Sequence, residues 1–269
     1  MSGILLNFGS WWSGAKLSYL RYLTFKSLRH FHPHSRIQLF TNKKFNKKGN
    51  AGITDLEFLT NSTQLDYMPK LKELGVEIVD TNFGPKLFCY QQADMYRWIY
   101  LRDQGGIYLD PDQIILKSFK SLPLDKYDFM YSSYNVNSIY APSGKFSPIG
   151  VLGGNNKAKI IQYVLSNILN YSKEGNYDAL GVLMMDDVIK KLDMSSYFNA
   201  PSHYFYPAPI GDYMNEIYSG AMKLGGESYS THWFGGTTPS QDFNRKYTEE
   251  FSKVSKDSIS VFLREKKII

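Results

Sequence analysis

The chain of 269 residues contains 31 Lys and Arg and 25 Asp and Glu. Hydrophobic residues make up 43% of the chain, and this share includes the aromatic residues Phe, Trp and Tyr, which make up 16% of the chain. This composition excludes extended disorder and predicts a folded globular protein. The net charge of +6 is spread along the chain apart from a small cluster at residues 43–48 and a basic C-terminus, which argues against nucleic-acid binding. An anionic small substrate or an anionic membrane surface suits this charge better.

Cysteine content and hydropathy restrict the class further. Cys89 is the only cysteine, so an intramolecular disulfide and a Cys-based zinc cluster are excluded. The N-terminal residues lack the basic flank and long apolar run of a signal peptide. No stretch of about 18 consecutive apolar residues occurs. We therefore expect a cytoplasmic protein without a transmembrane segment, soluble or peripherally attached to a membrane.

Strand and helix patterns alternate over the first 112 residues. The predicted strands are residues 4–8, 37–40, 76–79 and 107–109, and the predicted helices are residues 16–31, 65–74 and 86–104, with an Asn-, Lys- and Gly-rich loop at 41–52. This order predicts an α/β fold with a mainly parallel central sheet flanked by helices. Farther along, we expect strands at 129–134 and 139–140, helices at 158–171 and 180–192, an extended segment at 204–209, a Gly- and Thr-rich segment at 229–240 and a charged helical tail at 242–269.

Two aspartates stand two residues apart where the strand at 107–109 ends. The strand is opened by glycines, and Pro111, which lacks an N–H group, suggests that strand pairing stops there. Asp110 and Asp112 should therefore face solvent at a strand end. Mg²⁺ and Mn²⁺ are commonly bound by one or two carboxylates together with substrate phosphate oxygens. The alternative is a turn with solvated acids.

Two neighbouring segments add polar and aromatic groups. Asp94 and Arg97 lie three residues apart and hence on one helical face, although an intrahelical ion pair would also explain them. Ligands of open α/β sheets bind beyond the carboxyl ends of the strands. The loop predicted at residues 7–14 opens at that edge and offers Phe8, Trp11 and Trp12 for stacking on a base, with core packing as the alternative.

The run from residue 92 to residue 112 resembles the DXD-containing sugar-transferase family, glycosyltransferase family 32. It is also similar to the catalytic core of the clostridial glucosylating toxins. The shared features are the Asp and Arg helix, the Gly-Gly-Ile-Tyr-Leu-Asp strand and the Asp-x-Asp. Weaker similarity continues at residues 149–154, 205–207 and 231–233. Departures are Gly181-Val182 in place of Gly-Pro, and the residues 235–238, Gly-Gly-Thr-Thr, in place of Ser-Trp.

The resemblance implies a GT-A (nucleotide-diphospho-sugar transferase) fold. Residues 1–240 would form the catalytic domain, with a donor-binding half at about 1–116 and an acceptor-side half at about 117–240. Residues 241–269 would form a C-terminal helical tail packed on the same domain. The implied activity is a metal-dependent, retaining transfer of a sugar, by preference from a UDP-sugar, to a hydroxyl of a glycan, glycolipid or protein acceptor.

The resemblance also implies roles for individual residues. Asp94 and Arg97 would hold the donor, Asp110 the ribose or sugar, and Asp112 and the C-terminal His232 the Mn²⁺ or Mg²⁺ ion. Retention could proceed through a carboxylate nucleophile, for which Asp186 and Asp187 are candidates. The family resemblance favours front-face attack. The full sets are, for catalysis, Asp94, Arg97, Asp110, Asp112 and Asp187; for donor binding, Asn7, Phe8, Trp11, Asp94, Arg97, Tyr108 and Asp110; and for the metal, Asp112, His232 and Asp110.

Other functions remain as alternatives. A haloacid-dehalogenase-like phosphohydrolase also has an Asp-x-Asp after an apolar strand, with the first Asp as nucleophile. A catalytically silent module that binds nucleotide sugars or carbohydrates is the other alternative. The basic segment at residues 253–267 is a candidate for peripheral contact with an anionic membrane, with packing on the domain as the alternative.

Overall fold

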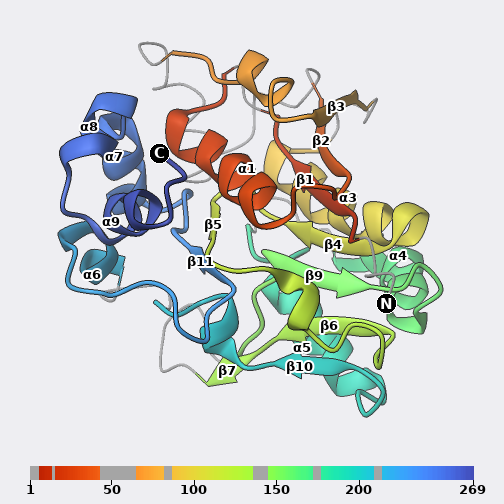
Figure 1. The fold of residues 1–269 in the computed structure, drawn as a ribbon. Helices are drawn as coiled ribbons and strands as arrows, with labels where there is room; N and C mark the ends of the chain where they lie inside the picture. The colour runs from red at the N-terminus through yellow and green to blue at the C-terminus, as the bar shows by residue number, and fades with distance from the viewer. Residues whose placement is uncertain are drawn as a thin grey trace.

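A seven-stranded sheet forms the centre of the computed structural model (Figure 1), with the strand order β10-β6-β9-β4-β1-β2-β3. These strands are β1 (Phe8–Trp11), β2 (Ile37–Thr41), β3 (Val76–Asp80), β4 (Gly106–Leu109), β6 (Phe129–Ser132), β9 (Val151–Gly154) and β10 (Phe198–Ala200). Only β9 pairs antiparallel with its neighbours in this sheet, β4 and β6. The predicted α/β class with a mainly parallel central sheet is therefore confirmed.

The structure describes residues 6–13, 16–42, 65–81, 87–135, 145–171, 177–208 and 214–269. The predicted strand at 139–140, the start of the predicted strand at 4–8 and most of the predicted loop at 41–52 lie outside the described residues, as does residue 86, where the third helix was predicted to begin.

Helices cover both faces of the sheet (Figure 1). On one face α1 (Tyr19–Phe31) shares an apolar cluster with Ile107 and Leu109 of β4. On the other face α3 (Cys89–Gln104), α4 (Lys159–Tyr171) and α5 (Val182–Lys191) enclose a second cluster that contains Tyr108. Successive side chains of a strand point to opposite faces. Ile107 and Leu109 of β4 thus pack in the helical layer on one face of the sheet, and Tyr108 packs in the layer on the other face.

Glycines fix the turn between α3 and β4. Gly105 caps α3 by donating its N–H to the carbonyl of Leu101, and its φ of 63° lies in the left-handed region. Gly106 has a φ of 89°, and a Cβ at that position would lie 2.5 Å from the carbonyl oxygen of Asn7. β4 can therefore begin directly after α3 and pair with β1, in the register that places Phe8 opposite Ile107.

The C-terminal tail forms helices that pack on the α1 side of the molecule (Figure 1). They are α7 (Thr238–Lys246), α8 (Glu249–Val254) and α9 (Ser258–Glu265), with α6 (Met214–Ser219) beside α9. Ile259, Phe262 and Leu263 are almost fully buried in the same cluster as α1. Three apolar side chains of the basic segment at residues 253–267 are thus used for packing, whereas Val254 is exposed and Val261 is half-buried. None of the helices among the described residues has the length and apolar character needed to cross a membrane.

Several predicted elements differ from the observed ones. The first strand lies later than predicted, and the predicted helix at 65–74 contains only the 3₁₀ turn η2 (Pro69–Leu71), since Pro69 cannot continue an α-helix. Within the segment predicted as extended, Tyr204 ends the 3₁₀ turn η4 (Ser202–Tyr204), and residue 209 lies outside the described residues. Short elements outside the predictions are β5 (Gln113–Ile115), the 3₁₀ turn η3 (Phe119–Ser121), β8 (Lys145–Phe146), β10, α6 and β11 (Ser230–His232). The strand predicted at 129–134 is divided into β6 and β7 (Tyr134–Asn135).

The pairing of β5 with β11 matters most for the site. The pairing of β4 ends at Leu109, before Pro111 as expected, and after a turn through Pro111 and Asp112 the chain pairs again, antiparallel with β11. Register places His232 opposite Gln113. The C-terminal segment therefore lies against the residues that follow β4.

Candidate active site

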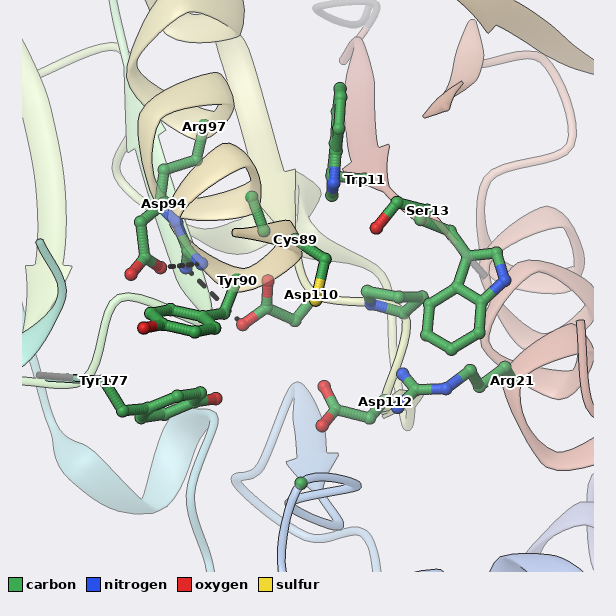
Figure 2. Close-up of a pocket in the computed structure, with 14 residues that line it drawn as sticks. Trp11, Ser13, Arg21, Cys89, Tyr90, Asp94, Arg97, Asp110, Asp112 and Tyr177 are labelled. Atoms are coloured by element: carbon green, nitrogen blue, oxygen red, sulfur yellow. Dashed lines mark hydrogen bonds and ion pairs between the residues drawn. The ribbon is translucent and has the colours of Figure 1, made fainter. Parts of the chain in front are cut away.

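A cleft opens at the carboxyl ends of β1 and β4 (Figure 2). It has two lobes, with cavity volumes of about 100 Å³ and about 310 Å³. Both lobes are bordered by the same six residues, which are Asp94, Arg97, Asp110, Asp112, Tyr177 and Gly236. The acidic residues predicted from the sequence thus lie at the junction of the two lobes.

Arg97 connects α3 to the end of β4. Its Nη2 lies 2.7 Å from Oδ1 of Asp94, and its Nη1 lies 3.5 Å from Oδ2 of Asp110 (Figure 2). Nη1 also donates to the carbonyl of Ile149. The Arg97 side chain is only 5% exposed, so the ion pair with Asp94 is largely screened from water. The guanidinium group of Arg97 is thus held between the carboxylates of Asp94 and Asp110 at the bottom of the cleft.

The backbone and side chain of Asp110 are both fixed. Its N–H donates to the carbonyl of Gly150 at 2.8 Å, and its Oδ1 accepts from the hydroxyl of Tyr108 at 3.1 Å. A Cβ on Gly150 would lie 3.0 Å from Oδ2 of Asp110, 3.3 Å from the Tyr206 hydroxyl and 3.4 Å from Cε1 of His232. Only a residue without a side chain fits there without displacing one of these groups.

Asp112 is held by the C-terminal segment. Its Oδ1 lies 2.8 Å from Nε2 of His232, and its Oδ2 accepts from the N–H of Gly235 at 2.8 Å. The N–H of Trp233 donates to the carbonyl of Asp112 at 3.1 Å. Asp112 and His232 are both buried. The β5–β11 pairing therefore delivers His232 to the Asp112 carboxylate.

Burial and neighbouring charges separate the pKa values of the carboxyl groups. Burial raises the pKa of Asp94 to about 7 despite the opposing charge of Arg97. Burial also raises the pKa of Asp110, with Arg97 opposing and Asp112 adding to the shift. Burial alone would raise the pKa of Asp112, but His232, Arg21 and the Gly235 N–H together hold it below its usual value. Asp112 is therefore the carboxyl group that stays ionised most readily.

The three predicted metal ligands come together. One ligand atom from each of Asp110, Asp112 and His232 can be chosen so that all lie within 4.8 Å of one another. Two carboxylate oxygens and one imidazole nitrogen suit a divalent cation such as Mn²⁺, and substrate phosphates can complete the coordination. The donor set thus fits the ion that the sequence resemblance implied.

The two lobes differ in chemistry. The smaller lobe is bordered by aromatic rings and by a second arginine, and its distinctive residues are Trp11, Trp12, Ser13, Arg21, Cys89 and Tyr90. The larger lobe is mainly apolar with a few polar groups, and its distinctive residues include Ile149, Asp178, Gly181, Val182, Phe234 and Thr237. The rings of Tyr90 and Tyr177 lie 5.0 Å apart near the junction (Figure 2).

Four predicted site residues do not border the cleft. Phe8 is 1% exposed and packs on His32 at a ring distance of 4.6 Å, so it belongs to the core. Asn7 lies at the opposite end of β1 from the cleft, where its carbonyl accepts from the N–H of Ile107. Tyr108 is fully buried and orients Asp110 from below, without bordering either lobe.

Asp187 is the fourth predicted site residue that does not border the cleft. Its carboxylate accepts from the Tyr171 hydroxyl and lies 2.7 Å from Nζ of Lys191, one turn further along α5. It borders neither lobe. The structure therefore does not bring Asp187 to the reacting centre, and the ion pair explains why an acid stands on this helix.

Sequence reasoning missed Arg21, Tyr90, Tyr177 and Asp178, which all border the cleft. For Arg21 a signal was present, because it follows Leu17 by four residues and therefore falls on the apolar face of the helix predicted at 16–31. The role of the Gly235 N–H depends on the backbone path, which no local sequence pattern predicts.

Fold and site together define a cleft that contains two arginines, several carboxylates and a candidate divalent-cation centre. Residues 20–129 match the family model described as "Glycosyltransferase sugar-binding region containing DXD motif". The predicted resemblance to this family is thus confirmed over that region. No curated protein matches the sequence significantly.

Solved structures with a similar arrangement include glycosyltransferases. PaToxG glycosyltransferase is 19% identical, with 69% of this chain and 68% of that chain covered and a TM-score of 0.45. GlyE of Streptococcus pneumoniae is 14% identical, with 98% and 64% covered and a TM-score of 0.49. The catalytic domain of Clostridium novyi alpha-toxin is 12% identical, with 61% and 57% covered and a TM-score of 0.38. The chain spans 64% of the length of the GlyE chain that it matches.

Proposed function

We propose that the protein is a metal-dependent glycosyltransferase that uses a nucleotide-diphosphate sugar as donor. The observation that carries the proposal is the convergence of Asp110, Asp112 and His232 beside the Asp94–Arg97 pair, at the junction of an aromatic lobe and a larger lobe. The family match over residues 20–129 supports the same class of reaction.

The two lobes suggest how the donor binds. The base and ribose would occupy the aromatic lobe, where Trp11 and Tyr90 offer flat surfaces. The diphosphate would lie at the junction. The sugar would extend into the larger lobe, within reach of Asp94 and Arg97, which can bind sugar hydroxyls. A UDP-sugar is the favoured donor by family resemblance, and the acceptor is a hydroxyl of a glycan, glycolipid or protein.

Asp110, Asp112 and His232 would hold a Mn²⁺ or Mg²⁺ ion. When bound, the cation would supply positive charge that neutralises the departing diphosphate. Arg97 adds a fixed positive charge from the floor of the cleft, and the Gly235 N–H and the β5–β11 pairing keep Asp112 and His232 in place. The protein thus orients these groups before the sugar is transferred.

We further propose a retaining reaction by front-face attack. The acceptor oxygen forms a bond to the anomeric carbon while the bond from that carbon to the diphosphate oxygen breaks. The bonding electrons leave with the diphosphate, and a diphosphate oxygen takes the proton of the acceptor hydroxyl. This route needs no carboxylate nucleophile, which agrees with the position of Asp187 away from both lobes.

Donor hydrolysis in the presence and absence of Mn²⁺ tests the proposal. A panel of UDP- and GDP-sugars is incubated with the protein, and released nucleoside diphosphate is measured. We expect release that requires Mn²⁺, is abolished by a chelator, and is lost in Asp112→Ala. Asp103→Ala is the matched control, since Asp103 is exposed at the end of α3 and pairs only with its neighbour Arg102 among the ion pairs of the described residues.

The same series separates the alternative functions. A phosphohydrolase would cleave simple phosphate monoesters and lose that activity in Asp110→Asn. A silent binding module would bind nucleoside diphosphate with Mn²⁺ and release none from any sugar donor, even with varied acceptors. Either result would contradict a glycosyltransferase.

A further inference from the structure

One guanidinium group fixes two neighbouring residues of the larger lobe. Nη2 of Arg97 lies 2.7 Å from Oδ1 of Asp94, and Nη1 of Arg97 donates to the carbonyl of Ile149. Asp94 and Ile149 both border the larger lobe. Arg97 therefore sets the position of an acidic side chain and of an apolar one within the same lobe.

The second carboxylate oxygen of Asp94 faces the cleft. Figure 2 shows one oxygen of Asp94 bonded to Arg97 and the other directed away from it. Within the part of the chain that the structure describes, Oδ2 of Asp94 receives no hydrogen bond. The Asp94 side chain is 12% exposed and borders both lobes. Since an ionised carboxylate only accepts hydrogen bonds, Oδ2 can receive an N–H or O–H group of a bound sugar.

Gly181 keeps open the space beside Oδ2. Its N–H donates to the carbonyl of Asp178 at 3.1 Å, and its carbonyl accepts from the N–H of Met185 at 3.1 Å. A Cβ on Gly181 would lie 3.7 Å from Oδ2 of Asp94 and 3.7 Å from Cδ1 of Ile149. The space beside Gly181 therefore has a hydrogen-bond acceptor on one side and a methyl group on the other.

The wall next to Gly181 is apolar. Phe146 and Val182 form a small buried cluster, separate from the two large clusters on the faces of the sheet. Phe146 lies in β8 and Val182 begins α5, and both border the larger lobe. A hydroxyl group placed against this wall would lose water without gaining a hydrogen bond, which is unfavourable. The wall therefore suits a methyl group better than a hydroxyl group.

We infer that the space beside Gly181 binds an acetamido group of the donor sugar, so that the donor is a nucleotide-linked N-acetylhexosamine. The N–H of the acetamido group would donate to Oδ2 of Asp94, and its methyl group would pack on Ile149 and Val182. A hydroxyl group could use the same acceptor but would leave the apolar wall without a partner. The inference rests on the proposed function, because it assumes that the donor sugar lies in the larger lobe.

Hydrolysis of donors with and without an acetamido group tests the inference. UDP-N-acetylglucosamine and UDP-N-acetylgalactosamine are compared with UDP-glucose and UDP-galactose in the presence of Mn²⁺, and kcat/KM is obtained from released UDP. The assays are run at about pH 8, because burial raises the pKa of Asp94 to about 7 and its carboxyl group is then largely ionised. We expect at least about a tenfold preference for one acetamido donor over its parent hexose donor, as is usual for a small apolar group in a fitted pocket.

Two substitutions alter the space and its wall. Gly181→Ala adds a methyl group beside Oδ2 and should lower the preference at least about tenfold. The fold should accept this methyl group, because its nearest neighbours would all lie at 3.7 Å. Affinity for UDP with Mn²⁺, measured calorimetrically, should change less than about twofold, since UDP carries no sugar. Val182→Thr keeps the shape of the wall but adds a hydroxyl group, and should also lower the preference.

A control separates this role from a structural one. Gly226→Ala adds the same methyl group outside the cleft, where no atom lies within 4 Å of the Cβ, and should keep the preference of the unaltered protein. If Gly181 only supports the start of α5, then Gly181→Ala will lower kcat/KM for both kinds of donor equally. An unchanged preference would overturn the inference. If Gly181→Ala does not fold, the preference of Val182→Thr decides in the same way.

The outcomes also distinguish this inference from the proposed function. If the unaltered protein neither binds UDP or GDP with Mn²⁺ nor releases them from any nucleotide sugar, the proposed function fails and the acetamido site fails with it. If the unaltered protein hydrolyses a hexose donor at least as well as the acetamido donors, the glycosyltransferase remains and only the acetamido site is overturned.

Discussion

Nε2 of His232 lies 2.8 Å from Oδ1 of Asp112, although 120 residues separate the two along the chain. The contact depends on a short antiparallel pairing in which His232 stands opposite Gln113, the residue after Asp112. A histidine far from the Asp-x-Asp is thereby placed with its aspartates. The contact connects the first half of the chain to the C-terminal segment at the point where a cation would bind.

Removal of the imidazole should weaken metal binding. We expect His232→Ala to lower Mn²⁺ affinity by at least about tenfold, since even residues that only orient metal ligands contribute that much. Mn²⁺ titration followed by calorimetry measures the effect. His203→Ala is the control, because His203 is exposed and pairs with Glu227 away from the cleft. Equal Mn²⁺ affinity in the two variants would remove His232 from the ligand set.

Gly150 should tolerate no side chain beside Asp110. A Cβ there would lie 3.0 Å from Oδ2 of Asp110, and we expect Gly150→Ala to lower the rate of donor hydrolysis about 10- to 100-fold through misplacement of the carboxylate. Gly153→Ala on the same region of chain is the control, since its Cβ would meet the flexible end of Met130 at 3.1 Å. Comparable rates in both variants would contradict the proposed importance of this packing.

Substitution of Asp94 on α3 and of Asp187 on α5 should affect the rate of donor hydrolysis differently. Asp94→Asn removes the partner of Arg97 at the bottom of the cleft and should lower donor hydrolysis by about 100-fold or more. Asp187→Asn should leave the rate within about twofold, as for other surface substitutions, because Asp187 pairs with Lys191 outside the cleft. A large loss of rate in Asp187→Asn would restore that residue as a catalytic candidate.

A methyl group added at Gly106, in the turn between α3 and β4, should lower the unfolding free energy of the protein. Gly106 has a φ of 89°, and its Cβ would lie 2.5 Å from the carbonyl oxygen of Asn7, so we expect Gly106→Ala to cost more than about 2 kcal/mol of unfolding free energy. Gly226 also has a positive φ but no atom within 4 Å of its Cβ, so Gly226→Ala should cost only about 1 kcal/mol. Urea denaturation of both variants would refute this view if their losses were equal.

Stability should fall at acidic pH because of one buried histidine. His32 is 1% exposed, its Nε2 accepts from the N–H of Phe119, and burial lowers its pKa to about 4 from 6.5. Below pH 6.5 the unfolded chain therefore binds a proton that the folded chain excludes. The stability that depends on neutral His32 is complete above pH 6.5 and is lost progressively down to pH 4, by up to about 3 kcal/mol.

The unfolding free energies of the unaltered protein and of His32→Gln are measured by denaturation between pH 7.5 and about 4.5. Their difference isolates the effect of His32, because the other titratable groups are the same in the two proteins. The difference in unfolding free energy should shrink as the pH falls. A difference independent of pH would mean that protonation of His32 does not govern acid stability.

The sequence was sufficient where the pattern was local. Gly105, Gly106 and the apolar residues of β4 predicted a buried strand that ends at Asp110, and helical spacing placed Asp94 and Arg97 on one face. These predictions depend on backbone geometry within a few residues. His232 came from resemblance alone, because no local signal links it to Asp112.

Errors arose where tertiary packing decides the outcome. The apolar run at residues 4–6 drew the first predicted strand toward the N-terminus, so that Asn7 and Phe8 were assigned to the wrong end of β1. Pairing of β5 with β11 depends on register between distant segments, which periodicity does not report. Asp187 was selected as a candidate carboxylate nucleophile, and only the structure reveals its partner Lys191.

The position of β11 has a consequence for protein synthesis. His232 and the Gly235 N–H complete the surroundings of Asp112, whereas most of the other residues that border the cleft lie earlier in the chain. During translation the cation centre cannot form until the ribosome has released the segment beyond Gly235. A nascent chain would therefore contain every strand of the central sheet before it could present all three candidate ligands to a cation.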